Sequence, residues 1–287
     1  MTALTLVRPV LPPPRARATT PALWIGVLLV AALGTAALAS LAWLPHAPDQ
    51  IDVLARLQGP SAAHWLGTDA FGRDVLMRIL AGARNALWVG AASVVLGLVL
   101  GAAVGFAAAA VGGWCEEILA RSADFLFAFP AVLSAILLAG MFGAGMASAV
   151  LAIGIFNIPV FARITRSAAA VLWRREFVRA AQGMGKTRLR ITLDHILPNL
   201  AGLLAVQASA SFAVAILAEA ALSYLGLGIQ PPAVSWGRML YEARTYLPVA
   251  PHLAVFPGLA LGILVLGMNL VGDGLRDRFD PRLRPPL

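Results

Sequence analysis

Long apolar runs alternate with short polar segments along almost the whole chain. Six runs stand out, at residues 23–44, 86–111, 118–141, 148–171, 200–225 and 253–270. Most of them approach or exceed the ~20 residues that a helix needs to cross the hydrocarbon core of a bilayer. The pattern therefore predicts an all-α, polytopic membrane protein with six transmembrane helices, the third of which is interrupted at Pro130.

Composition supports the membrane class and excludes others. The 287 residues are 60% hydrophobic and 13% charged, with a mean hydropathy of +0.81, whereas an ordinary soluble domain has roughly 25% charged residues. The net charge of +8 does not indicate nucleic-acid binding, because the basic residues cluster between apolar runs and no basic groove interleaved with aromatic residues is visible. The single cysteine, Cys115, excludes an intrachain disulfide framework and a cysteine-rich metal site.

The distribution of basic residues predicts how the chain lies in the membrane. Six spans place both termini on one side. If that side is the cytoplasm, the inner segments contain 16 Lys and Arg and the outer segments contain 6. Because cytoplasmic loops carry the basic excess, the sequence predicts an N-in, C-in orientation. The chain then divides into a cytoplasmic tail (1–22), a first span with an extracytoplasmic segment (23–85), a transmembrane domain (86–275) and a second cytoplasmic tail (276–287).

The most distinctive polar segment is the basic stretch at residues 174–199. Within it, Phe177, Ala181 and Met184 recur at i, i+4 and i+7, which is the spacing of an apolar stripe on a helix. Gly185 ends this pattern. The sequence therefore predicts a short amphipathic helix that stops at a glycine turn.

A second helical pattern follows within the same stretch. Thr187 is placed to cap it, and Pro198 marks a bend before the next apolar run. Its predicted apolar stripe comprises Leu189, Leu193, Ile196 and Leu197. Two interpretations are open: a solvated loop whose charges only set the membrane orientation, or a surface on which a partner docks. Two patterned helices joined at a glycine favour the docking surface.

This stretch resembles the cytoplasmic "EAA" loop of ABC-importer permeases, which has the pattern E-A-A-x3-G-x9-I-x-L-P. The matching residues, all at the required spacing, are Ala180, Ala181, Gly185, Leu197 and Pro198. Arg179 stands where the pattern has Glu, and His195 stands where it has Ile. The resemblance implies a loop that couples the spans to an ATPase, and Phe177 and Met184 are expected to belong to the same contact.

Three further stretches resemble the branch of these permeases that serves dipeptides, oligopeptides and nickel. They are HWLGTDAFGRDVLMRILAGAR from residue 64, RSADFLFAFP from residue 121, and EAALSYLGLGIQPPAVSWGRML from residue 219, which is followed by FPGLA and NLVGDGLRDRFDPR. The chain is more similar to the second permease subunit of the pair than to the first. The family implies an importer-type transmembrane domain in the bacterial inner membrane. It also implies a heterodimer with a second homologous permease, two cytoplasmic ATPases and an extracytoplasmic binding protein.

On this resemblance the chain is a non-enzymatic transport subunit for short peptides, with nickel or another small solute as the alternative within the family. ATP and Mg²⁺ are then expected in the partner ATPases, and no cofactor is expected in this chain. Gly185-Lys186-Thr187 imitates the end of a phosphate-binding loop. The complete motif needs a glycine at position 180, however, and this chain has Ala180.

Small residues recur within the spans. Gly97, Gly101 and Gly105 lie at four-residue spacing, which lets membrane helices approach closely. The spacing indicates either a specific contact with a partner helix or a helix that is simply rich in glycine and alanine.

Glu219 lies inside the fifth apolar run, where an ionisable group costs about 3 kcal/mol. One interpretation is that it lines the translocation path or locks a pair of helices. The other is that its side chain snorkels toward the outer interface. A stand-alone secondary transporter or membrane enzyme is the alternative from another class. A secondary transporter would show inverted repeats and several ionisable groups at the midplane, whereas only Glu219 lies deep in a span.

The sequence predicts neither a metal site nor a catalytic centre. Its four histidines are scattered, and no pair of them has the i, i+4 spacing of a helical metal site. The carboxylates form no evident acid–base pair, and no nucleophile elbow is present.

Overall fold

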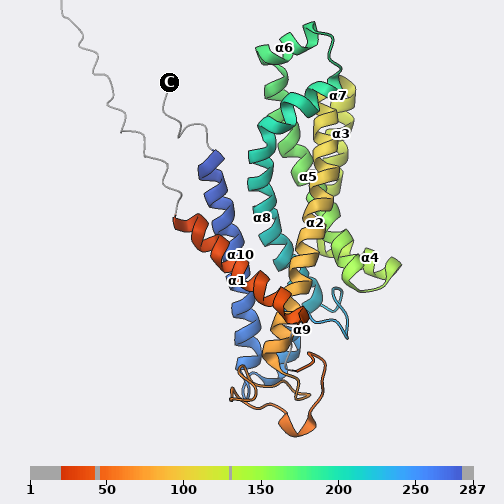
Figure 1. The fold of residues 1–287 in the computed structure, drawn as a ribbon. Helices are drawn as coiled ribbons and strands as arrows, with labels where there is room; N and C mark the ends of the chain where they lie inside the picture. Colours follow the sequence, from red (N-terminus) through yellow and green to blue (C-terminus); the bar gives the residue numbers. More distant parts are fainter. Residues whose placement is uncertain (1–20, 43–45, 129–130, 280–287) are drawn as a thin grey trace, which may run out of the picture.

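A computed structural model describes residues 21–42, 46–128 and 131–279, and within these residues it contains helices and loops but no β-strand (Figure 1). The long helices are α1 (Pro21–Ala42), α2 (Val75–Val111), α5 (Met146–Trp173), α8 (Leu197–Tyr224) and α10 (His252–Phe279). The shorter helices are α3 (Gly113–Ala128), α4 (Ala131–Phe142), α6 (Glu176–Gly183), α7 (Arg188–Ile191) and α9 (Trp236–Ala243). Single turns are η1 (Val53–Ala55), the π turn η2 (Thr192–Ile196) and η3 (Arg244–Tyr246). The predicted all-α fold is confirmed.

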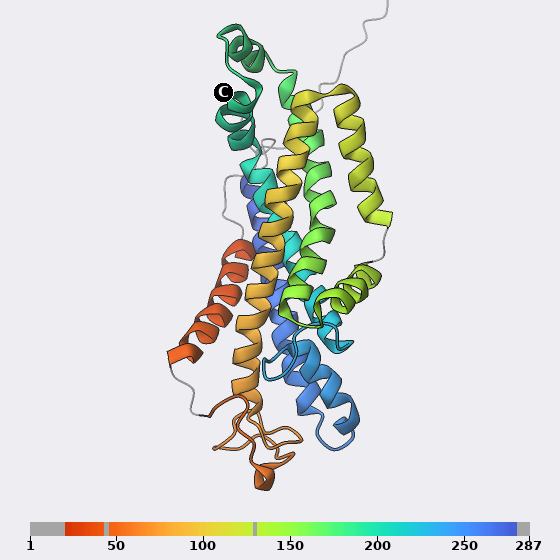
Figure 2. The ribbon, with the colours of Figure 1, turned by 90° about the vertical axis from the view of Figure 1, so that its right-hand side faces the viewer.

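Five helical segments are long and apolar enough to cross a membrane: α1, α2, α5, the run from α7 through α8, and α10. The third predicted span is divided between α3 and α4, on either side of residues 129–130, which lie outside the described residues. Figure 2 shows that α3 and α4 run in different directions, and the apolar part of α4 spans only Leu133–Phe142. A multi-pass membrane protein is therefore confirmed, whereas the count of six spans stays a prediction.

The second span begins earlier than its apolar run indicates. The run predicts a start near residue 86, but α2 begins at Val75. Asp74 caps the helix, because its carboxylate accepts a hydrogen bond of 3.0 Å from the Met77 N–H, one of the donors that a first helical turn leaves unpaired. Residues 75–85, which include Arg78, Arg84 and Asn85, thus form the first turns of the same helix.

Helices α2 and α5 make the most extensive helix contact in the described chain. Gly97, Gly101 and Gly105 lie along it. A Cβ atom at Gly101 would overlap the backbone oxygen of Ile158, and one at Gly105 would lie 2.6 Å from the backbone oxygen of Ala162. The four-residue glycine spacing therefore serves a contact within the chain, where it lets two backbones approach directly.

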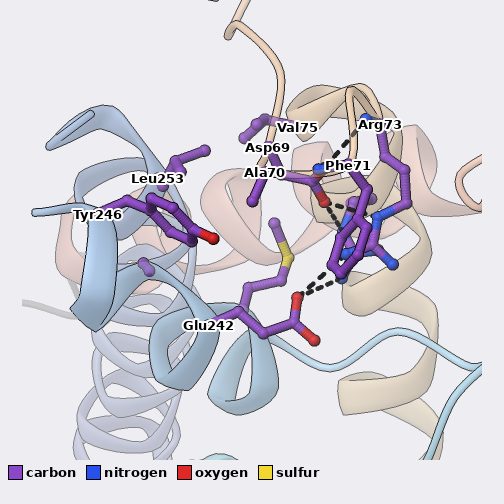
Figure 3. Close-up of a pocket in the computed structure, with 11 residues that line it drawn as sticks. Asp69, Ala70, Phe71, Arg73, Val75, Glu242, Tyr246 and Leu253 are labelled. Carbon is purple, nitrogen blue, oxygen red and sulfur yellow. Dashed lines mark hydrogen bonds and ion pairs between the residues drawn. The ribbon is translucent and has the colours of Figure 1, made fainter. Parts of the chain in front are cut away.

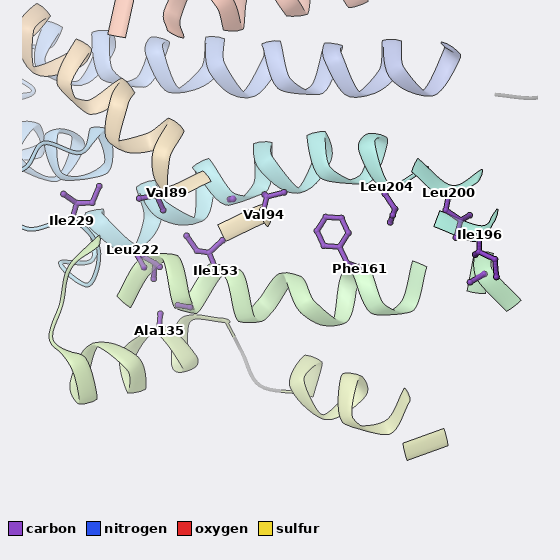
Figure 4. Close-up of a cluster of buried hydrophobic side chains, with 14 of the residues drawn as sticks. Val89, Val94, Ala135, Ile153, Phe161, Ile196, Leu200, Leu204, Leu222 and Ile229 are labelled. Carbon is purple, nitrogen blue, oxygen red and sulfur yellow. The ribbon is translucent and has the colours of Figure 1, made fainter. Parts of the chain in front are cut away.

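A hydrophobic core fills the space between α2, α5 and α8 (Figure 4). Its buried members include Val89, Val94, Ile153, Phe161, Leu200, Leu204 and Leu222. The same core continues beyond the spans into the short helices through Val178, Ala181, Ile191 and Ile196. The loop and the bundle are thus packed as one body.

Helix α1 lies against α10 at the side of the bundle. A Cβ atom at Gly26 would lie 2.7 Å from the backbone oxygen of Gly267, so these helices also approach through glycine. Large side chains on the outer face of α1, such as Trp24 and Leu28, are exposed. An exposed apolar face of this kind suits contact with lipid or with another membrane chain.

The two ends of the molecule carry different loops (Figures 1 and 2). Helices α6 and α7 lie at one end, and residues 46–74 lie with α9 at the opposite end. The loops predicted to be cytoplasmic and extracytoplasmic are therefore separated as a membrane protein requires. The N-in, C-in orientation itself stays a prediction from the charge distribution.

Adding a methyl group at the contact between α2 and α5 should weaken the fold. Gly101→Ala drives a Cβ atom into the backbone of α5, and overpacking of this kind costs about 1–3 kcal/mol. We expect a lower thermal unfolding midpoint for the purified protein in detergent. Gly140→Ala is the control, because a Cβ atom there meets no atom within 4 Å. Equal midpoints for the two variants would show that this contact does not depend on glycine.

Candidate functional site

The basic stretch at residues 174–199 forms two short helices at the end of the molecule, beyond α5 and α8 (Figure 1). Helix α6 comes first, and α7 follows with the π turn η2, which leads directly into α8. The two short helices predicted from the apolar pattern are therefore present.

The turn after α6 depends on Gly185. Its φ of +77° lies in the left-handed region, which glycine adopts without steric cost. The Gly185 N–H donates to the Gln182 carbonyl at 2.9 Å, and the Lys186 N–H donates to the Ala181 carbonyl at 3.2 Å. This pair of bonds is a Schellman motif, which satisfies the last carbonyls of a helix while the chain turns away. A side chain at Gly185 would strain the turn.

Two contacts fix the start of α7. The Thr187 hydroxyl accepts a hydrogen bond of 3.4 Å from the Arg190 N–H, which makes Thr187 the predicted N-cap. Arg188 Nη1 donates to the carbonyls of Ala110 at 2.8 Å and Val111 at 3.3 Å, at the end of α2. The last carbonyls of a helix have no intrahelical donor and carry partial negative charge, so they suit a guanidinium. The loop is thereby tied to α2.

Helix α6 buries a different face from the one that its sequence pattern indicates. Val178 and Ala181 are buried in the core, whereas Phe177, Ala180 and Met184 are exposed. The predicted stripe of Phe177, Ala181 and Met184 is therefore wrong at Ala181, which packs inward beside Val178. In a helix of two turns, Ala181 lies at the boundary between two faces, and the spacing alone cannot assign it to one of them.

The second short segment divides its apolar residues in the same way. Leu189 and Leu193 are exposed, whereas Ile191 and Ile196 are fully buried and Leu197 is partly buried. The predicted stripe on this segment thus combines two faces. The physical reason is the π turn, which shifts the helical period at residues 192–196.

Four large apolar side chains on these segments are exposed, namely Phe177, Met184, Leu189 and Leu193, and we call them the apolar tip. Met184 and Leu189 are the most exposed of them, at 73% and 70%. Exposed apolar surface at the end of a membrane protein is costly in water and is typical of an interaction site.

The two positions that depart from the importer pattern make polar contacts within the loop. Arg179 Nη1 donates to Glu176 Oε1 at 3.2 Å. His195 Nε2 lies 3.0 Å from Lys186 Nζ, and Lys186 Nζ also donates to Asp194 Oδ2 at 3.1 Å. Lys186, which resembles the lysine of a phosphate-binding loop, is therefore engaged with its own loop.

Pro198 does not end the helix that contains it. It lies in the first turn of α8, and the chain is helical from Arg188 to Tyr224. Proline has no N–H and crowds the carbonyl four residues earlier. The π turn accommodates this directly before Pro198, because the Leu197 N–H donates to the Thr192 carbonyl five residues back. The expected bend therefore takes the form of a π turn.

Comparison with known families decides what kind of protein carries this loop. The family described as "Binding-protein-dependent transport system inner membrane component" matches residues 93–285. The chain belongs to this family of importer permeases. As a permease it is a multi-pass protein of the inner membrane, and its family role is transport rather than catalysis. Its partners in general terms are an ATPase and a binding protein.

Curated relatives of the permease have names from peptide transport. It is 45% identical to the glutathione transport system permease protein GsiD of Pectobacterium atrosepticum, over 79% of this chain and 75% of that one. It is 44% identical to the dipeptide transport system permease protein DppC of Alkalihalophilus pseudofirmus, over 80% and 75%. A putative peptide permease protein of Brucella suis is 43% identical, over 90% of this chain and 86% of its own.

Among solved structures, the permease is similar to the methionine ABC transporter MetNI in an inward-facing conformation. The TM-score is 0.61, and the match covers 71% of this chain and 97% of that chain at 17% identity. This likeness establishes the fold, which is that of an importer-type transmembrane domain.

Glu219 is enclosed within the permease, with 1% of its surface exposed. Its Oε1 accepts hydrogen bonds from the hydroxyls of Ser223 at 2.7 Å and Ser235 at 2.9 Å. The Ser223 hydroxyl in turn accepts from the Ile229 N–H, and the Ser235 hydroxyl caps α9 by accepting from the Gly237 N–H. The carboxylate thus joins α8 to the loop and helix that follow it. This geometry favours the helix lock over snorkelling, and a part in transport stays a prediction.

An ionic cluster that the sequence pattern did not predict lies at the other end of the permease (Figure 3). Arg73 and Arg78 each donate to Glu242 Oε2, at 3.2 and 3.3 Å, and Arg73 Nε lies 2.6 Å from Asp69 Oδ2. The cluster clamps α2 to α9 beside a pocket of about 210 Å³ that is also lined by Tyr246. The two arginines lie in the family-like segment that begins at residue 64, but Glu242 follows Arg78 by 164 residues. Their separation in the sequence gives no indication that these residues form an ion pair.

Removing the Glu219 carboxylate should loosen α8 from α9. Glu219→Ala leaves two buried serine hydroxyls without their acceptor, which costs about 1–3 kcal/mol. We therefore expect a lower thermal unfolding midpoint in detergent and reduced uptake by the assembled importer. Glu219→Gln keeps an oxygen that can accept both bonds and should retain most of the stability. If the alanine variant unfolds and transports like the native permease, the carboxylate neither locks the helices nor lines the path.

Proposed function

We propose that the permease forms half of the translocation path for short peptides in an ATP-driven importer. It pairs with a second homologous permease chain, and the pair binds two cytoplasmic ATPases, one of which docks on the short helices α6 and α7. An extracytoplasmic binding protein delivers the substrate. ATP and Mg²⁺ bind in the ATPase chains. The observation that carries this proposal is the apolar tip, which is exposed on a loop that the rest of the chain holds firmly.

The loop is suited to transmit a movement to the spans. Its buried face belongs to the core between α2, α5 and α8, Arg188 ties it to the end of α2, and η2 continues into α8 without a break. A displacement of the tip by the ATPases therefore acts on three long helices together. This supports alternating access, in which closure of the ATPases rocks the spans to open the path outward.

The residues of the loop divide into two roles. Phe177, Ala180 and Met184 are exposed and contact the ATPase, with Arg179 at the rim of the contact. The other residues that match the importer pattern shape the loop from within, and they are Ala181, Gly185, Leu197 and Pro198. In this arrangement apolar anchors hold the complex, whereas rim charges mainly steer the encounter.

Short peptides are the substrate class that the relatives' names support. These names refer to glutathione, to dipeptides and to peptides in general, and glutathione is itself a small peptide. None of the three refers to nickel, which is the alternative within the family.

Uptake by the complete importer tests both the tip and the substrate class. Met184→Glu or Leu189→Glu places a charge in the proposed contact, and loss of such an anchor costs about 2 kcal/mol, roughly thirtyfold in ATPase binding. We expect uptake of a radiolabelled dipeptide and co-purification of the ATPase to fall together, at equal membrane levels. Gln182→Glu adds the same charge to an exposed position of α6 outside the tip and should behave like the native permease.

The outcomes separate the two parts of the proposal. Normal uptake by both tip variants would show that the loop is only a linker. With the native importer, unlabelled dipeptides should compete for uptake and Ni²⁺ should not. Competition by Ni²⁺ alone would replace the peptide assignment with the nickel alternative.

The permease is oriented with both termini in the cytoplasm, on the basis of the basic excess in the predicted inner segments. In a Cys115→Ala background, a cysteine at the exposed Ser61 should react with an impermeant thiol reagent added to spheroplasts. Cysteines at Thr5 and Pro286 should react only after the membrane is made permeable. Labelling of either terminus in intact spheroplasts would reverse the orientation.

A further inference from the structure

Three residues with metal-binding side chains meet at the end of the permease opposite the apolar tip. His46 follows α1, His64 lies in the segment between η1 and α2, and Asp74 is the N-cap of α2. One candidate ligand atom from each residue lies within 4.8 Å of the other two. His46 and His64 are far apart in the sequence, and the fold brings them together from different segments.

The distances between these side chains are close to those between ligands that bind one metal ion. His64 Nδ1 lies 2.9 Å from Asp74 Oδ2, and the ring centroids of His46 and His64 are 5.2 Å apart with a tilt of 42°. Two imidazoles on one tetrahedral zinc, each with a Zn–N bond of ~2.0–2.1 Å, place their nitrogens about 3.3 Å apart. His46 and His64 are both partly exposed, so rotation of their side chains can close the remaining gap.

The charges around Asp74 also favour a cation. Asp74 is 4% exposed, and its Oδ1 already accepts the Met77 N–H as a helix cap. The neighbouring Arg73 and Arg78 are paired with Asp69 and Glu242. Among the residues that the structure describes, no arginine or lysine pairs with Asp74. No cationic side chain of the described residues therefore neutralises this buried carboxylate, and a bound cation beside the two imidazoles would do so.

We propose that His46, His64 and Asp74 bind a divalent transition-metal ion of the zinc class, with water in the fourth position. Two imidazole nitrogens and one carboxylate oxygen are a set that zinc accepts from three protein ligands. Calcium and magnesium prefer sites made of oxygen alone, so they are disfavoured here. The bound ion fastens the segment that leaves α1 to the first turn of α2, and it thereby stabilises the outer end of the permease.

Zinc titration of the full-length permease tests this site. The protein is purified in detergent with an affinity tag that contains no histidine, freed of metal with a chelator, and titrated with Zn²⁺ by calorimetry. We expect about one ion per chain and a higher thermal unfolding midpoint with zinc, because a ligand that binds only the folded state stabilises it.

Matched variants locate the ion. His46→Gln removes one ligand but keeps the His64–Asp74 pair and the cap of α2, so the fold should persist. Zinc affinity should fall at least about tenfold, since even the loss of an outer-shell partner costs 10–100-fold. His64→Gln should have a similar effect. His195→Gln removes a histidine at the opposite end of the molecule and should bind zinc like the native permease.

The proposal is overturned if the native permease shows no saturable zinc binding. It is also overturned if His46→Gln and His64→Gln bind zinc as tightly as the native chain, or if His195→Gln loses binding to the same extent as they do. Loss of affinity in the two outer variants alone, with the zinc-dependent rise in the unfolding midpoint lost as well, supports it.

Discussion

The close contact between α2 and α5 is the interaction on which the rest of the permease depends. In hydrocarbon, lipid tails surround apolar side chains as favourably as other helices do, so association relies on close packing and on polar contacts. Gly97, Gly101 and Gly105 remove the side chains that would hold the two backbones apart. The pair then offers a continuous surface to α8, and the core between the three helices follows from it. The loops at both ends of the molecule are attached to these helices, so their positions depend on this contact.

The end of the molecule that carries α6 and α7 extends this packing out of the spans. The buried residues of α6, α7 and η2 belong to the same core as those of the long helices, so the loop is held by packing as well as by its own turns. Arg188 adds a charged contact with the carbonyl end of α2. The apolar tip remains exposed on the other face of the loop. The loop is therefore firmly packed against the spans and exposes an apolar surface, as the proposed contact with an ATPase requires.

At the opposite end, polar contacts add to a second hydrophobic core, which packs the start of α2 against α9 and α10. Glu219 joins α8 to α9 through the Ser235 hydroxyl, and Glu242 of α9 pairs with Arg78 of α2 and with Arg73, which lies just before α2. The arginines are paired with carboxylates, which limits the cost of taking their charges out of water, and Glu219 accepts two hydrogen bonds instead. His46, His64 and Asp74 add a third polar junction, between the segment after α1 and the start of α2. These junctions let loops of irregular structure keep a fixed position on the spans.

The sequence by itself determined the membrane class, the approximate course of five long helices, the two short helices with their turn at Gly185, and the family. Each of these features depends on residues that are near one another in the chain, such as an apolar run, a glycine at a helix end or a helix cap. Interactions between neighbouring residues are therefore enough to predict them. Only the tertiary structure decided that Ala181 faces inward, that Glu219 reaches Ser235, and that His46 meets His64. These contacts depend on which helix faces which, and that is fixed by packing between segments far apart in the sequence. The divided third span has the same origin, since Pro130 predicts an interruption but the directions of α3 and α4 are set by the helices around them.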